Sequence, residues 1–463
     1  MKRLTWILSL LLCCASTLGA ADATVKLPPF TRVQLKNGIT LLLMEQREVP
    51  LISMSLIVKA GSVADPQGKE GLAAATADLL KKGTKSRSSD QIASELDFTG
   101  GTFEMTGSID FTSGNAEFMK KDLRKGLDLM ADILMHPAFP QEEVKKLLDQ
   151  NIDQLKSAKD RAASVIGRYY YAYLYGSHPY GRPTGGDEIS LPSITRADVE
   201  KFYETYYVPG NLILAAAGDF NPPEMRQMIE ERLGAWPSRN APPVPVEAPK
   251  PSSGKRLLLV DKPDSTQTYI YIGNLGVART NPDRIGVSVV NAVFGGLFTS
   301  HLNTALRIDT GLTYGANSIF TQRRQPGPFT ISTFTKNATT GQAIDLALQI
   351  LKDLHEKGLT DKELQSAKAY LKGQYATNLE TTNQLASTIA SLEFFGLGPN
   401  DVDSYYSKVD AMNTAEAQRI IKQYFPLDHL VFVLVGKASE IRPVAQKYAP
   451  KIDQKNITQP GFF

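Results

Sequence analysis

The sequence repeats itself at a nearly constant spacing, and this repeat constrains the fold more strongly than any single motif. The segment SITRADVEKFYETYYVPGNLILAAAGDF, residues 193–220, resembles AMNTAEAQRIIKQYFPLDHLVFVLVGKAS, residues 411–439. Within them Tyr206 pairs with Tyr424 at an offset of 218, and the upstream stretches FPQEEVKKLL and LTDKELQSAK match at an offset of 220. Similar patterns in the same order predict a duplicated domain.

A proline-rich stretch lies between the two repeats. WPSRNAPPVPVEAPKPSSGK contains six prolines with serine and glycine, a composition typical of an extended linker. At 463 residues the chain is also too long for one average domain. The predicted division is a signal peptide over 1–21, an N-terminal domain over 22–235, the linker over 236–255 and a homologous C-terminal domain over 256–463.

Hydrophobic periodicity predicts an α+β fold for each repeat, with helices packed on a largely antiparallel sheet. In the first repeat the Asn37-Gly38 dipeptide, flanked by apolar residues, indicates a hairpin. Further strands are expected over 51–61 and 102–117, and helices over 70–83, 89–98, 120–135 and 141–160.

The N-terminus has the pattern of a secretory signal. Lys2 and Arg3 precede an apolar run from Leu4 to Leu18, and small residues follow, so cleavage is expected near Ala20 to Ala23. Both cysteines of the sequence lie inside this signal, and the mature chain therefore has neither disulfides nor thiolate ligands. We expect a periplasmic protein. A lipid-anchored form would be lipidated on Cys13 or Cys14, but the preceding residues, Leu12 and Cys13, do not fit the small residues that a lipidation site requires.

Composition excludes some classes of partner. The formal net charge is only +3, and no basic run or aromatic-basic stripe suggests nucleic acid. We expect no membrane association after the signal is removed.

Several stretches together resemble the pitrilysin/insulinase family of zinc peptidases, and the resemblance covers essentially the whole mature chain. The stretches are GSVADPQGKEGLA with LLKKGT, HPYGRP at 178–183, TRADVEKFYETYYVPGNLILAAAGD at 195–219 and LRIDTGLTYG at 306–315. The resemblance implies a duplicated α+β fold and a peptidase-like function.

The zinc motif of that family is missing from this chain. Members carry His-x-x-Glu-His on one helix face, where two imidazoles bind Zn²⁺ and the carboxylate acts as general base. Aligned through the flanking GLA and KGT, the motif positions fall on Ala74, Ala77 and Asp78, and the downstream ligand position falls on Gln154. Alanine cannot ligate a metal, and the five histidines are scattered singly. We therefore expect no metal on this chain.

The C-terminal half, in contrast, keeps a second pair of residues that the family uses. The resemblance implies that Arg307 and Tyr314, seven residues apart, face the zinc site and donate hydrogen bonds to the substrate carbonyl and to the developing oxyanion. The alternative places Arg307 on a helix surface and packs Tyr314 in the core.

Two functions follow. In the first, the chain is the non-zinc subunit of a heterodimeric periplasmic zinc metallopeptidase: it is inactive alone, supplies Arg307 and Tyr314, and forms half of a chamber for short or unfolded peptides. A homologous partner would carry the Zn²⁺, and peptides would bind by strand addition, for example at GGTFEMTGSIDFTSG. In the second, it is a catalytically inactive peptide-binding or structural scaffold protein. An enzyme with other chemistry, using Asp78 as an acid, is disfavoured because no nucleophile elbow, P-loop or dinucleotide motif occurs.

Overall fold

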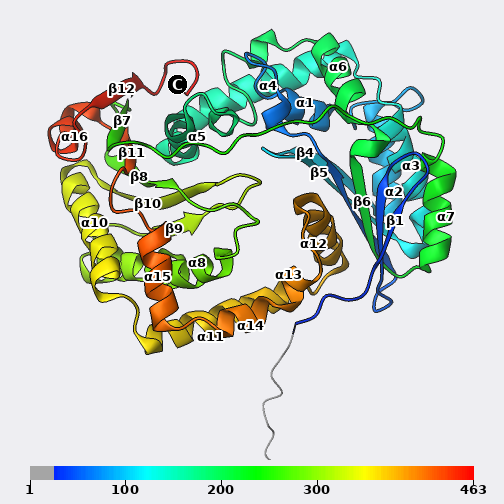
Figure 1. Cartoon of the computed structure of the whole chain (residues 1–463). Helices are drawn as coiled ribbons and strands as arrows, with labels where there is room; N and C mark the ends of the chain where they lie inside the picture. The colour runs from blue at the N-terminus through cyan, green and yellow to red at the C-terminus, as the bar shows by residue number, and fades with distance from the viewer. Residues whose placement is uncertain (1–24, 463) are drawn as a thin grey trace, which may run out of the picture.

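The computed structural model describes residues 25–462, so the predicted signal peptide lies outside the described residues. Two six-stranded sheets, one in each repeat, lie on opposite sides of the molecule (Figure 1). The first contains β1 (Thr31–Gln34), β2 (Thr40–Glu45), β3 (Leu51–Val58), β4 (Thr102–Gly107), β5 (Thr112–Met119) and β6 (Leu212–Gly218). The second contains β7 (Arg256–Asp261), β8 (Gln267–Leu275), β9 (Ala316–Phe320), β10 (Pro328–Lys336), β11 (Val431–Gly436) and β12 (Ile452–Asn456).

Helices connect these strands in the same order in both halves. The first half has α1 (Leu72–Leu79), α2 (Ser89–Thr99), α3 (Leu123–Met135), α4 (Gln141–Lys159), α5 (Ala162–Tyr175), α6 (Arg196–Tyr206) and α7 (Pro222–Leu233). The second has α8 (Arg284–Asn291), α9 (His301–Asn303), α10 (Thr340–Lys357), α11 (Asp361–Thr377), α12 (Thr382–Phe395), α13 (Asn400–Asp403), α14 (Tyr405–Asp410), α15 (Thr414–Tyr424) and α16 (Ala438–Ala445). Two π-helical segments are η6 (Ala292–Gly296) and η7 (Thr304–Asp309), and short 3₁₀ turns are η1 (Ser62–Ala64), η2 (Lys120–Asp122), η3 (Pro179–Gly181), η4 (Leu191–Ser193), η5 (Pro209–Asn211) and η8 (Asn337–Thr339).

The sheets confirm the predicted α+β class and the internal repeat. Their strand orders, β1-β2-β6-β3-β5-β4 and β12-β7-β11-β8-β10-β9, correspond strand by strand except at the first position. There β1 pairs antiparallel with β2, whereas β12 comes from the end of the chain and pairs parallel with β7. Helices α6 and α15 end on the two tyrosines that the repeat aligns, Tyr206 and Tyr424.

Local sequence explains where several of the helices begin. Helices α2, α6, α11 and α12 each start with a capping box, in which a Ser or Thr hydroxyl and an acidic or amide side chain three positions later bind each other's backbone N–H. The hairpin predicted at Asn37-Gly38 joins β1 to β2, and Gly38 has a positive φ of 107° that its side-chain-free backbone permits.

Each sheet is covered on one face by helices of its own half and on the other by a helix of the opposite half. Helix α12 of the second half packs on β3 and β6, where Leu385 and Ile389 are buried. Helix α5 of the first half packs on β8 and β11, where Val165 and Tyr170 are buried. Figure 1 shows both helices beside the sheet of the other half. The two halves are therefore interlocked by a reciprocal exchange of helices.

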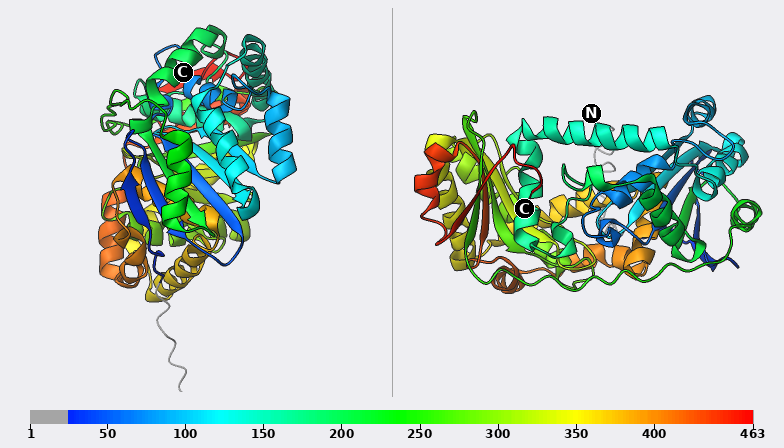
Figure 2. Two further views of the ribbon diagram at one scale, coloured as in Figure 1. Left: turned by 90° about the vertical axis from the view of Figure 1, so that its right-hand side faces the viewer. Right: turned by 90° about the horizontal axis from the view of Figure 1, so that it is seen from above.

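The connection between the halves is extended. Residues 237–255 form no helix or strand in the structure, and the chain there runs along the surface (Figure 2). One helical stretch of the described chain, Arg284–Asp309, is long and apolar enough to span a membrane. Most of this stretch is buried in the second half, as expected for a core helix.

Candidate functional site

Helix α1 carries the positions of the expected zinc motif, and a remote carboxylate holds its first turn. The N-cap residue Gly71 has no side chain to cap the helix and adopts a positive φ of 98°. Instead the buried Asp65 carboxylate accepts hydrogen bonds from the N–H groups of Gly71 (2.9 Å) and Ala73 (2.8 Å). Asp65 is not among the residues predicted from the sequence. The only sequence pattern that indicates its role is the position of an acidic residue shortly before the helix N-terminus.

The motif positions lie together on α1, but they are partly closed by packing. Ala77 is only 1% exposed, whereas Ala74 and Asp78 are half-buried, and burial raises the pKa of the Asp78 carboxyl. Strand β4 approaches so closely that a Cβ at Gly107 would lie 2.6 Å from the Cα of Ala74. Gln154 lies on an exposed face of α4, a helix that packs against α1.

These residues do not fit a catalytic zinc ion. Two of the three helix positions are alanines without a ligand atom, and a lone half-buried carboxylate cannot complete a tetrahedral site. Across residues 25–462 the structure gathers no group of three His, Cys, Asp or Glu side chains that could hold a metal ion. We therefore derive no metal-dependent step on this chain.

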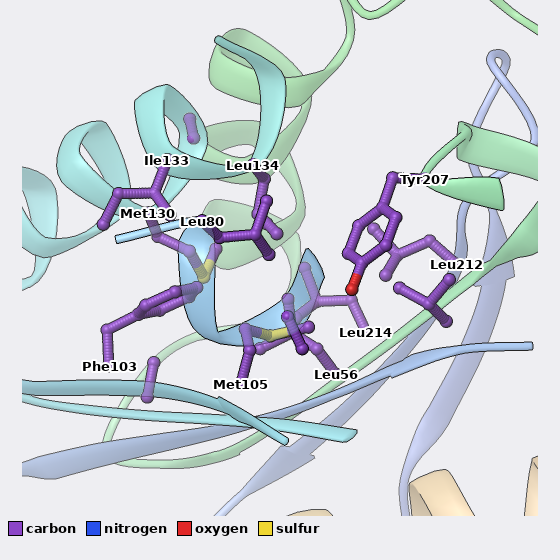
Figure 3. Close-up of a cluster of buried hydrophobic side chains, with 14 of the residues drawn as sticks. Leu56, Leu80, Phe103, Met105, Met130, Ile133, Leu134, Tyr207, Leu212 and Leu214 are labelled. Atoms are coloured by element: carbon purple, nitrogen blue, oxygen red, sulfur yellow. The ribbon is translucent and has the colours of Figure 1, made fainter. Parts of the chain in front are cut away.

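A tyrosine behind α1 carries a buried polar group without a partner. Figure 3 shows the Tyr207 hydroxyl directed into a cluster of apolar side chains that includes Leu56, Met105 and Leu214. No other described residue accepts or donates a hydrogen bond to this hydroxyl, and burial raises the pKa of the phenol. The nearby Thr112 hydroxyl donates to a backbone carbonyl and lies outside hydrogen-bond geometry to Tyr207.

We expect Tyr207→Phe to raise the free energy of unfolding by about 1 kcal/mol, because the substitution removes an unpaired buried hydroxyl and keeps the ring. The matched control is Tyr203→Phe, since the Tyr203 hydroxyl donates to the Leu134 carbonyl at 2.7 Å. That control is expected to lose about 1 kcal/mol in urea denaturation. A Tyr207→Phe variant less stable than the parent would show that its hydroxyl is paired in solution.

The second group of predicted residues, Arg307 and Tyr314, lies at the two ends of one closed loop. The Leu306 carbonyl accepts hydrogen bonds from the N–H groups of Leu312 (3.0 Å) and Thr313 (3.3 Å). Arg307 directly follows Leu306, and Tyr314 directly follows Thr313. The hydrogen bond between Leu306 and Thr313 therefore brings Arg307 and Tyr314 to neighbouring positions. Within the loop, Gly311 adopts a positive φ of 63°, which favours glycine.

Both side chains of this pair are directed away from the core. Tyr314 is 81% exposed, which excludes the alternative in which it packs in the core. Arg307 lies in the π-helical segment η7, and its guanidinium carbon lies 4.8 Å from the centre of the exposed Phe298 ring. Neither the guanidinium nor the phenol makes a hydrogen bond within the described chain, so both groups remain available as donors.

A hollow of about 520 Å³ adjoins the pair. Phe298 and Gly315, the neighbours of Arg307 and Tyr314, line it together with residues of β8, β10 and α5. Arg307 and Tyr314 thus each lie next to a residue that lines the hollow without lining it themselves, and whether they act in catalysis stays a prediction. The hollow itself could not be predicted, because α5 comes from the other half.

The two groups form separate sites in this chain. Helix α1 contacts β4, α4 and α6 in the first half, whereas η7 contacts α9 and α10 in the second. The first site keeps the scaffold of a zinc helix without its ligands, and the second presents hydrogen-bond donors without a metal. Together with the duplicated fold, this combination defines a peptidase-like protein.

The family follows from comparison with known sequences. Residues 41–188 match the model of the insulinase peptidases, peptidase family M16, and residues 193–371 match the model named peptidase M16 inactive domain. The chain belongs to this insulinase, or pitrilysin, family, as the sequence resemblance predicted. It is a member that lacks the zinc ligands on α1.

Its relatives include proteins named as zinc proteases. The uncharacterized zinc protease YmxG of Bacillus subtilis is 24% identical over 87% of this chain and 97% of its own length. An uncharacterized zinc protease of Mycobacterium tuberculosis is 26% identical over 81% of this chain and 85% of its own.

Solved structures share the fold over nearly the whole chain. A peptidase M16 inactive domain from Pseudomonas fluorescens superposes with a TM-score of 0.83 at 24% identity, over 92% of this chain and 99% of its own. A protease from Helicobacter pylori gives 0.83 at 20% identity, over 89% and 100%. These likenesses confirm the two-repeat α+β architecture.

Proposed function

We propose that this chain is the non-zinc subunit of a heterodimeric zinc metallopeptidase of the insulinase family, exported to the periplasm. In this role it has no hydrolytic activity alone, and a homologous subunit with an intact His-x-x-Glu-His motif carries the Zn²⁺. The observation that carries the proposal is the contrast between the two sites: Ala74, Ala77, Asp78 and Gln154 replace the zinc motif and its downstream ligand, yet Arg307 and Tyr314 remain exposed with unused donors.

The hydrogen-bond donors of Arg307 and Tyr314 suit peptide hydrolysis, in which an acyl group is transferred to water. A guanidinium and a phenol can each donate a hydrogen bond to the carbonyl oxygen of a peptide and to the negative charge that develops there during hydrolysis. Folding uses neither donor in a hydrogen bond, and the two side chains lie next to Phe298 and Gly315, which line the hollow. We therefore assign both side chains to the partner's active site.

The sheet edges support binding of an extended peptide at β4 rather than at β9. On the outer edge of β9, the Ala316 N–H donates to Asn303 Oδ1 (3.3 Å) and the Ser318 carbonyl accepts from Asn291 Nδ2 (2.9 Å). The two asparagine side chains thus already bond the backbone N–H and carbonyl groups that an added strand would need for pairing. Strand β4 is also an edge strand, and within residues 25–462 no side chain bonds to its backbone in this way.

Co-expression tests the proposal. The chain is produced with a zinc-bearing homologue and purified, and hydrolysis of a quenched fluorescent peptide is measured for the pair and for each chain alone. Activity restricted to the pair, with zinc only in the homologue, supports the proposal. A stable pair or a peptide complex with no gain in hydrolysis would favour the scaffold function. Stoichiometric zinc and hydrolysis in this chain alone would overturn the proposal.

A further inference from the structure

Two side chains of the first half hold the turn between β9 and β10 of the second. The Arg324 N–H donates to Asp110 Oδ2 (2.9 Å), and the Gln325 N–H donates to the Tyr180 hydroxyl (2.9 Å). The Tyr180 hydroxyl in turn donates to Asp110 Oδ1 (2.7 Å). A carboxylate and a phenol therefore bind two consecutive N–H groups, which fixes both the position and the orientation of the turn.

Both of these side chains are buried, so their hydrogen bonds are costly to break. Asp110 is 5% exposed and Tyr180 is fully buried. Burial raises the pKa of the Tyr180 phenol, which keeps it protonated and able to donate to Asp110. Asp110 lies in the turn between β4 and β5, the counterpart in the first half of the turn that it binds.

The same turn inserts a cation between aromatic rings of the first half. The Arg323 guanidinium carbon lies 5.2, 5.7 and 5.0 Å from the ring centres of Tyr171, Tyr175 and Tyr180. Arg323 is only 8% exposed, and its Nη1 has no hydrogen-bond partner among the described residues. Three tyrosine faces thus stabilise this buried charge.

The interdomain linker meets the halves at this place as well. Arg324 Nη2 donates to the Val244 carbonyl (2.6 Å), and Gln325 Nε2 donates to the Val246 carbonyl (2.8 Å). We call the group formed by Asp110, Tyr180 and residues 323–325 the joint. First half, linker and second half are bound to one another through it.

Strand β9 connects the joint to the candidate catalytic loop. It begins two residues after Tyr314 and ends at Phe320, immediately before the turn that the joint holds. Along its length β9 pairs with β10, so a hydrogen-bonded strand rather than flexible chain links the joint to the loop.

We propose that Asp110 and Tyr180 are positioning residues, which set the placement of the Arg307–Tyr314 loop relative to the first half of the chain. As a statement about catalysis, this rests on the proposed function. As a statement about geometry, it can be tested on this chain alone. The joint touches neither Arg307 nor Tyr314, and it acts through β9.

The test measures the distance between the halves. Because the mature chain has no cysteine, spin labels can be placed through Ser94→Cys on α2 and Lys352→Cys on α10, both exposed. Tyr180→Phe removes the hydroxyl and keeps the ring, and the control Tyr203→Phe removes a hydroxyl bonded within the first half. We expect Tyr180→Phe to broaden the distance distribution and Tyr203→Phe to leave it unchanged. Equal distributions in Tyr180→Phe and the parent would overturn the proposal.

The second readout is the activity of the assembled pair. We expect Tyr180→Phe to lower kcat by about tenfold with little change in KM, because misplaced donors weaken stabilisation of the transition state more than binding. An unchanged kcat beside a broadened distance would overturn the catalytic part of the inference. If the parent pair itself is inactive while the distance broadens, the proposed function fails and the geometric role of the joint stands.

Discussion

Replacing Arg307 with Ala, or Tyr314 with Phe, is expected to lower the peptide hydrolysis rate of the assembled pair by about 10²-fold. Each substitution removes a donor that we assign to the substrate carbonyl and to the charge developing on it. Loss of one such donor typically costs about 10²–10³ in kcat. The measurement is steady-state hydrolysis of a quenched peptide by the pair, with the substitution in this chain only.

Because both side chains are exposed, these two substitutions test the role in catalysis without affecting the stability of the fold. Because Tyr314 is 81% exposed and Arg307 lies on the surface, neither change is expected to alter the urea midpoint of this chain. The matched control is Ile308→Ala, which truncates an exposed neighbour that is 55% accessible and offers no donor. Unchanged hydrolysis by both variants, or an equal loss in the control, would contradict the assigned role.

Separating the two halves is expected to abolish folding of each one. A fragment of residues 22–235 lacks α12, so the face of β3 and β6 that α12 covers would be exposed. Its helix α5 would also be exposed, because α5 packs on β8 and β11 of the other half. Each large apolar side chain returned to water costs about 2 kcal/mol, and several are involved on both surfaces. Such losses exceed the net stability of an ordinary domain. Circular dichroism during thermal unfolding would show no cooperative transition for either fragment.

A nicked chain provides the control for this experiment. A protease site inserted into the linker at 236–255 allows cleavage after folding, and the two fragments are expected to remain associated and to unfold in one transition. Co-production of the two halves should restore the native species for the same reason. A cooperative transition of residues 22–235 alone, near that of the full chain, would show that the helix exchange is dispensable.

The predictable parts of the fold are those with a local cause. Turn chemistry at Asn37-Gly38 and the capping boxes of α6 and α11 fix elements through neighbouring residues, and the repeat offset in the sequence is enough to align Tyr206 with Tyr424. The helix predicted over 70–83 is present as α1, and its apolar residues Leu72 and Leu79 are buried.

The remaining features depend on contacts between distant parts of the chain. Periodicity shows that α5 and α12 each have an apolar face, but it does not tell which sheet that face covers. Asp65 caps α1 from outside the helix, and Tyr180 binds a turn 145 positions away. Only the resemblance to a family identifies the motif positions on α1, because no local pattern marks three unreactive residues as a site.

The exchange of helices between the halves also suits an origin by duplication of one repeat. A single repeat cannot cover both faces of its own sheet, so before duplication such a repeat would have been stable as a symmetric dimer in which each copy lent a helix to the other. Fusion of two such repeats through a linker keeps the same exchanged contacts within one polypeptide. Once fused, the two copies no longer had to be identical. One could lose its reactive residues while the other kept a different set, as long as both still supplied a helix to their neighbour.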